Sequence, residues 1–111
     1  MQRATVTALL ITAAATLTAC GGDGKRVYVE AGCQECHGMD MRGTMTSGPS
    51  LRGAGRHWNV ESLLSYFANP DSVVATDERL STLRARYGSG MPPLKVADPN
   101  ARRALAEYVP R

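Results

Sequence analysis

Apolar residues recur along this chain with the spacing of an α-helix rather than that of a strand. The clearest instance is segment 60–68, whose hydrophobic residues lie three and four positions apart: Val60, Leu63, Leu64 and Phe67. Asn69-Pro70 follows, and proline disfavours a helical conformation in the residue before it, so we expect the helix to end there. No segment alternates apolar and polar residues as a strand would. The pattern predicts an all-α domain.

A second helix is predicted earlier in the chain, over residues 24–31. Asp23 can cap its first turn and Gly32 can end it. Its apolar face would consist of Val27, Tyr28 and Ala31.

Two more helices are predicted towards the C-terminus, giving about four in all. One opens at Thr76 or Asp77 and ends at Gly88, and the other opens at Asp98-Pro99 and ends before Pro110. Their apolar faces would be Leu80, Leu83 and Tyr87 in the first, and Ala101, Leu105 and Tyr108 in the second. Residues 38–57, rich in glycine, serine and threonine, read as loop.

The chemistry of the chain is concentrated in Cys33-Gln34-Glu35-Cys36-His37. This C-x-x-C-H arrangement is the attachment motif of c-type haem. Cys33 and Cys36 would form thioethers with the haem, and the imidazole of His37 would bind its iron. A redox C-x-x-C expects a βαβ context and a zinc site expects further Cys or His pairs, neither of which the sequence contains. The motif therefore predicts one covalently bound haem c and points to electron transfer.

The N-terminal segment resembles a bacterial export signal. Arg3 supplies a positive charge, residues 4–19 form a short apolar run, and Leu17-Thr18-Ala19-Cys20 resembles the lipobox of lipoproteins. A transmembrane helix would need a longer run, of about 20 apolar residues. We expect removal of residues 1–19 and lipidation of Cys20.

This export signal, the leader, implies how the rest of the chain is organised. Residues 20–23 would be a tether that anchors the protein to a bacterial membrane, facing the periplasm or the exterior, and residues 24–111 would be the haem domain. The alternative is a plain signal peptide in which Cys20 is incidental.

The length of 111 residues leaves room for a single domain, and the net charge argues against nucleic acid as a partner. So small a domain usually depends on a disulfide, a metal or a cofactor, and haem would fill that role. The formal net charge is only +3, Arg3 belongs to the leader, and two haem propionates would offset the remainder. Charge gives no case for nucleic-acid binding, and we expect a monomer.

Beyond the attachment motif, the chain resembles the class I cytochromes c over nearly all of residues 24–109. Gly48-Pro49-Ser50-Leu51-Arg52-Gly53 matches the family's G-P-x-L-x-G loop, and Trp58 to Pro70 align without gaps to W-x-x-E-x-L-x-x-Y-x-x-N-P. Gly24 and Tyr28 resemble the glycine and aromatic of the family's N-terminal helix. The resemblance implies that these two pack against Leu105 and Tyr108 in the C-terminal helix.

The same resemblance implies how the protein would surround the haem, through Pro49, Leu51, Arg56, Trp58 and Tyr66. The carbonyl of Pro49 would accept the Nδ1 proton of His37, which fixes the ring as a ligand. Leu51 would pack on the haem face, Arg56 and Trp58 would lie near a propionate, and Tyr66 would reach the sulfur of the axial methionine.

The sixth iron ligand implied by the resemblance is Met91, because Gly90-Met91-Pro92-Pro93 is similar to the ligand loop of bacterial members. A His/Met pair raises the reduction potential and leaves no position for a substrate. His57 is the competing ligand and would give a bis-histidine haem. Met39, Met41 and Met45 follow His37 too soon to cross to the other face; they could bind copper, but packing is the commoner role of such methionines.

The sequence departs from the mitochondrial pattern at two points. His57 and Trp58 follow Arg56 directly, where longer members insert a loop. Segment 71–90 is longer than in the mitochondrial pattern and contains an additional helix, whose role the sequence does not indicate. We expect a one-electron carrier, not an enzyme, working between a donor and an acceptor protein. The alternatives are a dedicated haem subunit of one reductase or oxidase, or a peroxidase or gas sensor if Met91 does not bind iron.

Overall fold

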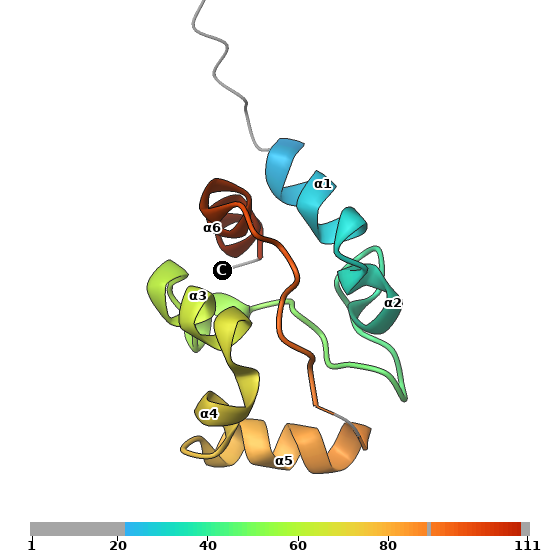
Figure 1. Ribbon diagram of the computed structural model, residues 1–111. Helices are drawn as coiled ribbons and strands as arrows, with labels where there is room; N and C mark the ends of the chain where they lie inside the picture. The colour runs from blue at the N-terminus through green and yellow to red at the C-terminus, as the bar shows by residue number, and fades with distance from the viewer. Residues whose placement is uncertain (1–21, 89, 110–111) are drawn as a thin grey trace, which may run out of the picture.

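The computed structural model describes residues 22–88 and 90–109, which form six α-helices and one 3-10 turn, with no strand in either range (Figure 1). In chain order the elements are α1 (Gly22–Glu30), α2 (Cys33–His37), the 3-10 turn η1 (Ala54–Arg56), α3 (Val60–Ala68), α4 (Pro70–Val74), α5 (Glu78–Tyr87) and α6 (Pro99–Tyr108). The all-α prediction is confirmed. The predicted leader and Cys20 lie outside the described residues.

Helix α1 lies against α6, so the two ends of the domain are joined (Figure 1). Gly24 makes this approach possible, because a Cβ atom there would lie 2.6 Å from the carbonyl oxygen of Ala104 and would also collide with Tyr108. The rings of Tyr28 and Tyr108 meet edge to face with their centroids 5.8 Å apart. The packing implied by the resemblance is confirmed, although Ala31 is exposed rather than on the buried face.

Helix α3 completes the core by also packing on α6. The predicted apolar stripe faces inward, with Leu63 and Phe67 buried. A capping box starts the helix, in which Asn59 Oδ1 accepts from the amide of Ser62 at 2.8 Å. The buried core draws on four parts of the chain: Val27, Tyr28, Met41, Leu63, Phe67, Leu105, Ala106 and Val109.

Two short helices were not expected, and their length explains why. The attachment motif forms its own helix, α2, separated from α1 by Gly32 in the left-handed region at φ 78°. Helix α3 ends at Ala68 as predicted, but α4 starts at once, with Pro70 in its first turn. Each has five residues, too few to show a 3.6-residue repeat. Helix α1 begins at Gly22, two residues before its predicted start.

Helix α5 lies at the end of the molecule opposite α1 and α6 (Figure 1). Asp77 caps it by accepting from the amide of Leu80 at 3.1 Å, and Gly88 ends it with φ 71°. It packs on α4, where Ser81 Oγ donates to the carbonyl of Val74 at 2.9 Å. No helix in the described part of the chain is both long enough and apolar enough to cross a membrane.

Candidate haem-binding site

The three residues of the attachment motif lie on the single turn of α2. Cys33, Cys36 and His37 occupy positions i, i+3 and i+4, which share one side of a helix. Both cysteines are free thiols, Cys33 half-buried and Cys36 exposed. Burial raises the pKa of the Cys33 thiol. The short helix therefore presents two thiols and an imidazole together.

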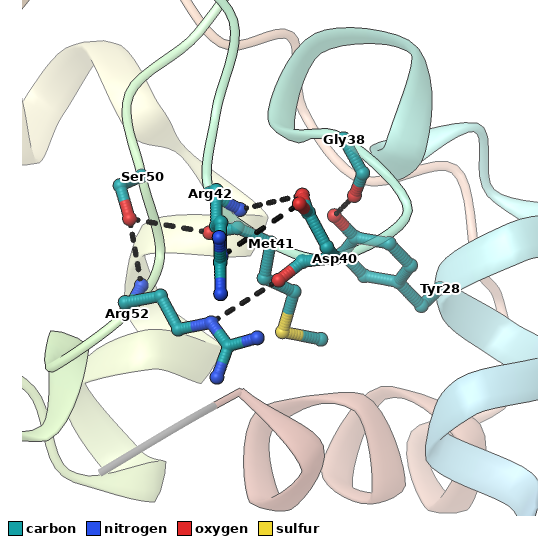
Figure 2. A network of polar contacts seen from close by, with 7 residues as sticks. All are labelled: Tyr28, Gly38, Asp40, Met41, Arg42, Ser50 and Arg52. Atoms are coloured by element: carbon teal, nitrogen blue, oxygen red, sulfur yellow. Dashed lines mark hydrogen bonds and ion pairs between the residues drawn. The ribbon is translucent and has the colours of Figure 1, made fainter.

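A glycine and a buried tyrosine fix the C-terminal end of α2. Gly38 follows His37 with φ 82°, a conformation that glycine adopts without strain. Its carbonyl accepts a hydrogen bond from Tyr28 Oη at 2.6 Å, linking the motif to α1 (Figure 2). Burial, followed by the nearby Cys33, Tyr108 and Asp40, raises the pKa of Tyr28 to about 12. The phenol therefore remains a neutral donor over the physiological range.

The side chain of His37 is oriented by the loop that follows it. Its Nδ1 lies 2.8 Å from the carbonyl oxygen of Pro49. A carbonyl only accepts, so Nδ1 carries the proton and Nε2 is left as the nitrogen with a free lone pair. The structure thus contains the hydrogen bond that the resemblance implies, and it fixes the tautomer that a metal ligand needs.

The loop that carries Pro49 is braced around Met41 (Figure 2). The carbonyl of Met41 accepts from the amide of Leu51 at 2.8 Å and from Ser50 Oγ at 3.3 Å. Arg52 Nε donates to the carbonyl of Asp40 at 3.2 Å. These contacts close residues 40–52 into a compact loop, which holds the carbonyl of Pro49 in place.

The three methionines after the motif do not lie together. Met41 is 5% exposed and belongs to the core, with φ 61°, whereas Met39 and Met45 are 62% and 96% exposed. Core packing therefore accounts for Met41. Because Met41 lies in the core and Met39 on the surface, the loop does not bring together the sulfur ligands that copper would need.

Met91 lies in the segment between α5 and α6 and is half-buried against the core. Shortly after it, the amide of Leu94 donates to the carbonyl of Phe67 at 2.9 Å, which ties the segment to the end of α3. Shortly before it, Gly90 packs against the guanidinium of Arg84. The methionine is therefore held between two anchored points.

Trp58 and Tyr66 form an aromatic pair, with ring centroids 4.9 Å apart. Both are half-buried, and Arg79 on α5 lies 5.7 Å from the centre of the Trp58 ring. Burial raises the pKa of Tyr66, while the charges of Arg84 and Arg79 act in the opposite direction. The structure thus places Arg79 and Arg84 beside the aromatic pair, a contact that the matched motifs do not predict because α5 lies outside them.

The remaining predicted residues differ in exposure. Leu51 is half-buried and packs against the core, as expected of an apolar contact. Arg56 and His57 are both exposed at the end of η1. Nothing in the fold draws His57 inward to compete with Met91.

The donor set fits a haem c group better than a bare metal ion. Two free thiols share a helix side with an imidazole whose Nε2 is free, and a half-buried thioether comes from a separate segment. In contrast, residues 22–88 and 90–109 contain no group of three or more His, Cys, Asp or Glu side chains that could hold a metal ion. A zinc site would need such a group.

Comparison with known proteins identifies a family. A family model described as Cytochrome c matches residues 22–110, which covers all of the described helices. No curated protein and no solved structure matches the chain.

Proposed function

Because the chain belongs to the cytochrome c family, we propose that it is a monohaem class I member that carries one electron at a time between two redox proteins. Family membership supports covalently bound haem c and electron transfer rather than catalysis. The single C-x-x-C-H motif in the sequence supports one haem. When bound, that haem supplies the one-electron redox change.

The observation that carries the proposal is the hydrogen bond from His37 Nδ1 to the carbonyl of Pro49. It orients the ring and raises the basicity of Nε2, the two properties that an axial ligand needs. Cys33 and Cys36, on the same side of α2, would hold the group covalently next to that nitrogen. Attachment and proximal ligation would thus come from one turn of helix.

Met91 is proposed as the sixth ligand. Its thioether is half-buried in an anchored segment, whereas His57 is exposed. A soft thioether would favour the ferrous state and raise the potential, and with Met91 bound to the iron no site would remain for a substrate. The proposal is therefore a carrier and not a peroxidase or gas sensor.

Four further side chains would surround the group. Leu51 would supply an apolar contact, and Arg56 and Trp58 would lie near a propionate. Tyr66, beside Trp58, would reach towards the sulfur of Met91. The contact between the rings of Trp58 and Tyr66 supports their action as one unit.

The first test is the absorption spectrum of the haem-loaded ferric protein. A methionine–iron bond gives a weak far-red charge-transfer band, which we expect in the wild type and expect to vanish in Met91→Ala. The matched control is Met45→Ala, which removes an exposed methionine and should keep the band. A wild-type spectrum of high-spin or bis-histidine type would refute the ligand assignment and favour the enzyme or sensor.

The location of the protein is proposed from the leader alone. Lipidation at Cys20 would hold the domain at the outer face of a bacterial membrane, where a tethered carrier meets its partners at raised effective concentration. Cys20→Ser should move the haem protein from the detergent phase to the aqueous phase on phase partitioning. Unchanged partitioning would argue against the anchor.

The range of redox partners separates a general carrier from a dedicated subunit. A general carrier should exchange electrons with several soluble acceptors, with rates that fall as salt is added. Stable co-purification with a single reductase or oxidase would favour the dedicated subunit instead.

A further inference from the structure

Arg84 contacts the segment that presents Met91. If Gly90 carried a Cβ atom, that atom would lie 2.7 Å from Nε and 2.8 Å from Cζ of Arg84, closer than real Cβ contacts. The guanidinium is therefore packed directly on the backbone of Gly90, the residue before Met91. Only glycine permits this approach without displacing the arginine.

Arg84 is itself held from a second element. Its Nη2 forms an ion pair with Asp71 Oδ1 on α4, and its side chain is only 39% exposed. Its charge also acts on Tyr66 of α3, where it opposes the effect of burial on the pKa. One side chain thus joins α4, α5 and the Met91 segment beside the aromatic pair.

Other arginines of the domain do not share this arrangement. Arg86, on the same helix, is exposed and lies 5.6 Å from the ring centre of its own neighbour, Tyr87. Arg103 pairs with Glu61 at 2.9 Å and joins α6 to α3. Ordinary surface ion pairs of this kind contribute little to the free energy of unfolding, about 0–1 kcal/mol. Arg84 differs because it also supports an irregular segment.

We propose that Arg84 is a positioning residue for the sixth iron ligand, clamping Gly90 so that Met91 is presented in one conformation. The inference rests on the proposed function, because it assumes that Met91 binds the iron. It also assigns a role to α5, the helix that the mitochondrial pattern lacks: α5 carries the clamp, and Asp71 on α4 orients it. Without the clamp, conformations in which Met91 is away from the iron become more populated.

The test is competition by imidazole for the ferric iron of the haem-loaded protein. An added ligand binds only where the methionine has left, so its apparent affinity rises with the population of that state. Arg84→Ala should raise the imidazole affinity about two- to fivefold, the range that loss of one partly exposed contact allows. Asp71→Asn, which keeps the arginine but releases it, should act in the same direction by less.

Two control variants separate positioning from general stability. Arg86→Ala removes the same charge from the same helix and should leave the imidazole affinity unchanged. Arg103→Ala breaks a surface ion pair elsewhere and should leave the imidazole affinity unchanged, with at most a small change in the thermal midpoint. If Arg84→Ala behaves like these controls, the positioning role is wrong.

A double-mutant cycle tests the contact itself. Gly90→Ala should raise the imidazole affinity, because the new methyl group displaces the guanidinium. In an Arg84→Ala background that collision is gone, so the same substitution should have little further effect. Additive effects would overturn the proposed contact.

Ligation by Met91 and positioning by Arg84 can be refuted separately. A wild-type protein without the far-red band overturns Met91 ligation and, with it, the positioning role. A wild-type protein that shows the band, together with an Arg84→Ala variant of unchanged imidazole affinity, overturns the positioning role alone.

Discussion

At the scale of single residues, Gly24 decides whether α1 and α6 can meet. A methyl group there would collide with Tyr108 and approach the carbonyl of Ala104 to 2.6 Å. Gly24→Ala should therefore lower the free energy of unfolding by about 1–3 kcal/mol, as overpacking does. Denaturant unfolding of the haem-loaded protein measures this change. Lys25→Ala, on an exposed position of the same helix, should change it by no more than about 0.5 kcal/mol.

Tyr28 makes the stability of the domain fall with rising pH in the alkaline range. Its pKa is raised from 10.0 to about 12 in the folded protein, chiefly by burial, so folding favours the neutral phenol. This stabilisation is complete below pH 10 and is lost as the pH rises through about 12, where the folded protein also ionises.

The matching variant is Tyr28→Phe, which cannot ionise. At neutral pH it should be less stable by about 1 kcal/mol, because the hydrogen bond to Gly38 is gone. Between pH 10 and 12 the difference from the wild type should shrink. Unfolding free energies measured across that range check this, and a constant difference would show that Tyr28 does not titrate as stated.

At the scale of elements, α3 depends on the capping box at its start. Asn59 Oδ1 accepts from the amide of Ser62, and Ser62 Oγ accepts from the amide of Asn59 at 2.9 Å. Asn59→Ala should cost about 1 kcal/mol of unfolding free energy, measured by denaturant titration. Asn100→Ala is the control, since Asn100 is exposed and its side chain is not the cap of α6, which is Asp98. Equal losses in the two variants would count against the cap.

The apolar pattern of the sequence predicts some of the helices and not others. The helix at 60–68 has a clear apolar stripe, a cap and a proline after it, and the structure agrees with each. Helices α2 and α4 were missed because five residues are too few to show periodicity, and both depend on flanking glycine, asparagine or proline. Local signals thus predict long elements well and short ones poorly.

At the scale of the whole molecule, the domain is expected to depend on its haem. Among the described residues the main buried cluster has eight members, and a domain this small buries too little surface to be very stable by itself. A variant with both Cys33→Ala and Cys36→Ala, which cannot hold haem covalently, should unfold at a clearly lower denaturant concentration than the haem-loaded wild type. The near-ultraviolet circular dichroism signal reports this transition, and an unchanged midpoint would refute the dependence.

Of the candidate site, the sequence could indicate the residues that belong to motifs. His37 and Pro49 were paired by the resemblance, and the structure contains their hydrogen bond. Arg79 and Arg84 belong to no motif, and their positions beside Trp58 and Gly90 follow only from the packing of α5 on α4. A contact between elements distant in sequence leaves no local pattern from which to predict it.

The sequence by itself determined the class of fold and indicated the chemistry of haem attachment. Helical periodicity depends on the spacing of apolar residues, and the C-x-x-C-H motif depends on covalent chemistry, so both are local properties that one reading of the chain reveals. The tertiary structure decided which methionines are buried, which nitrogen of His37 is free, and what supports the Met91 segment. These depend on burial and on hydrogen bonds between distant segments, which exist only once the chain has folded.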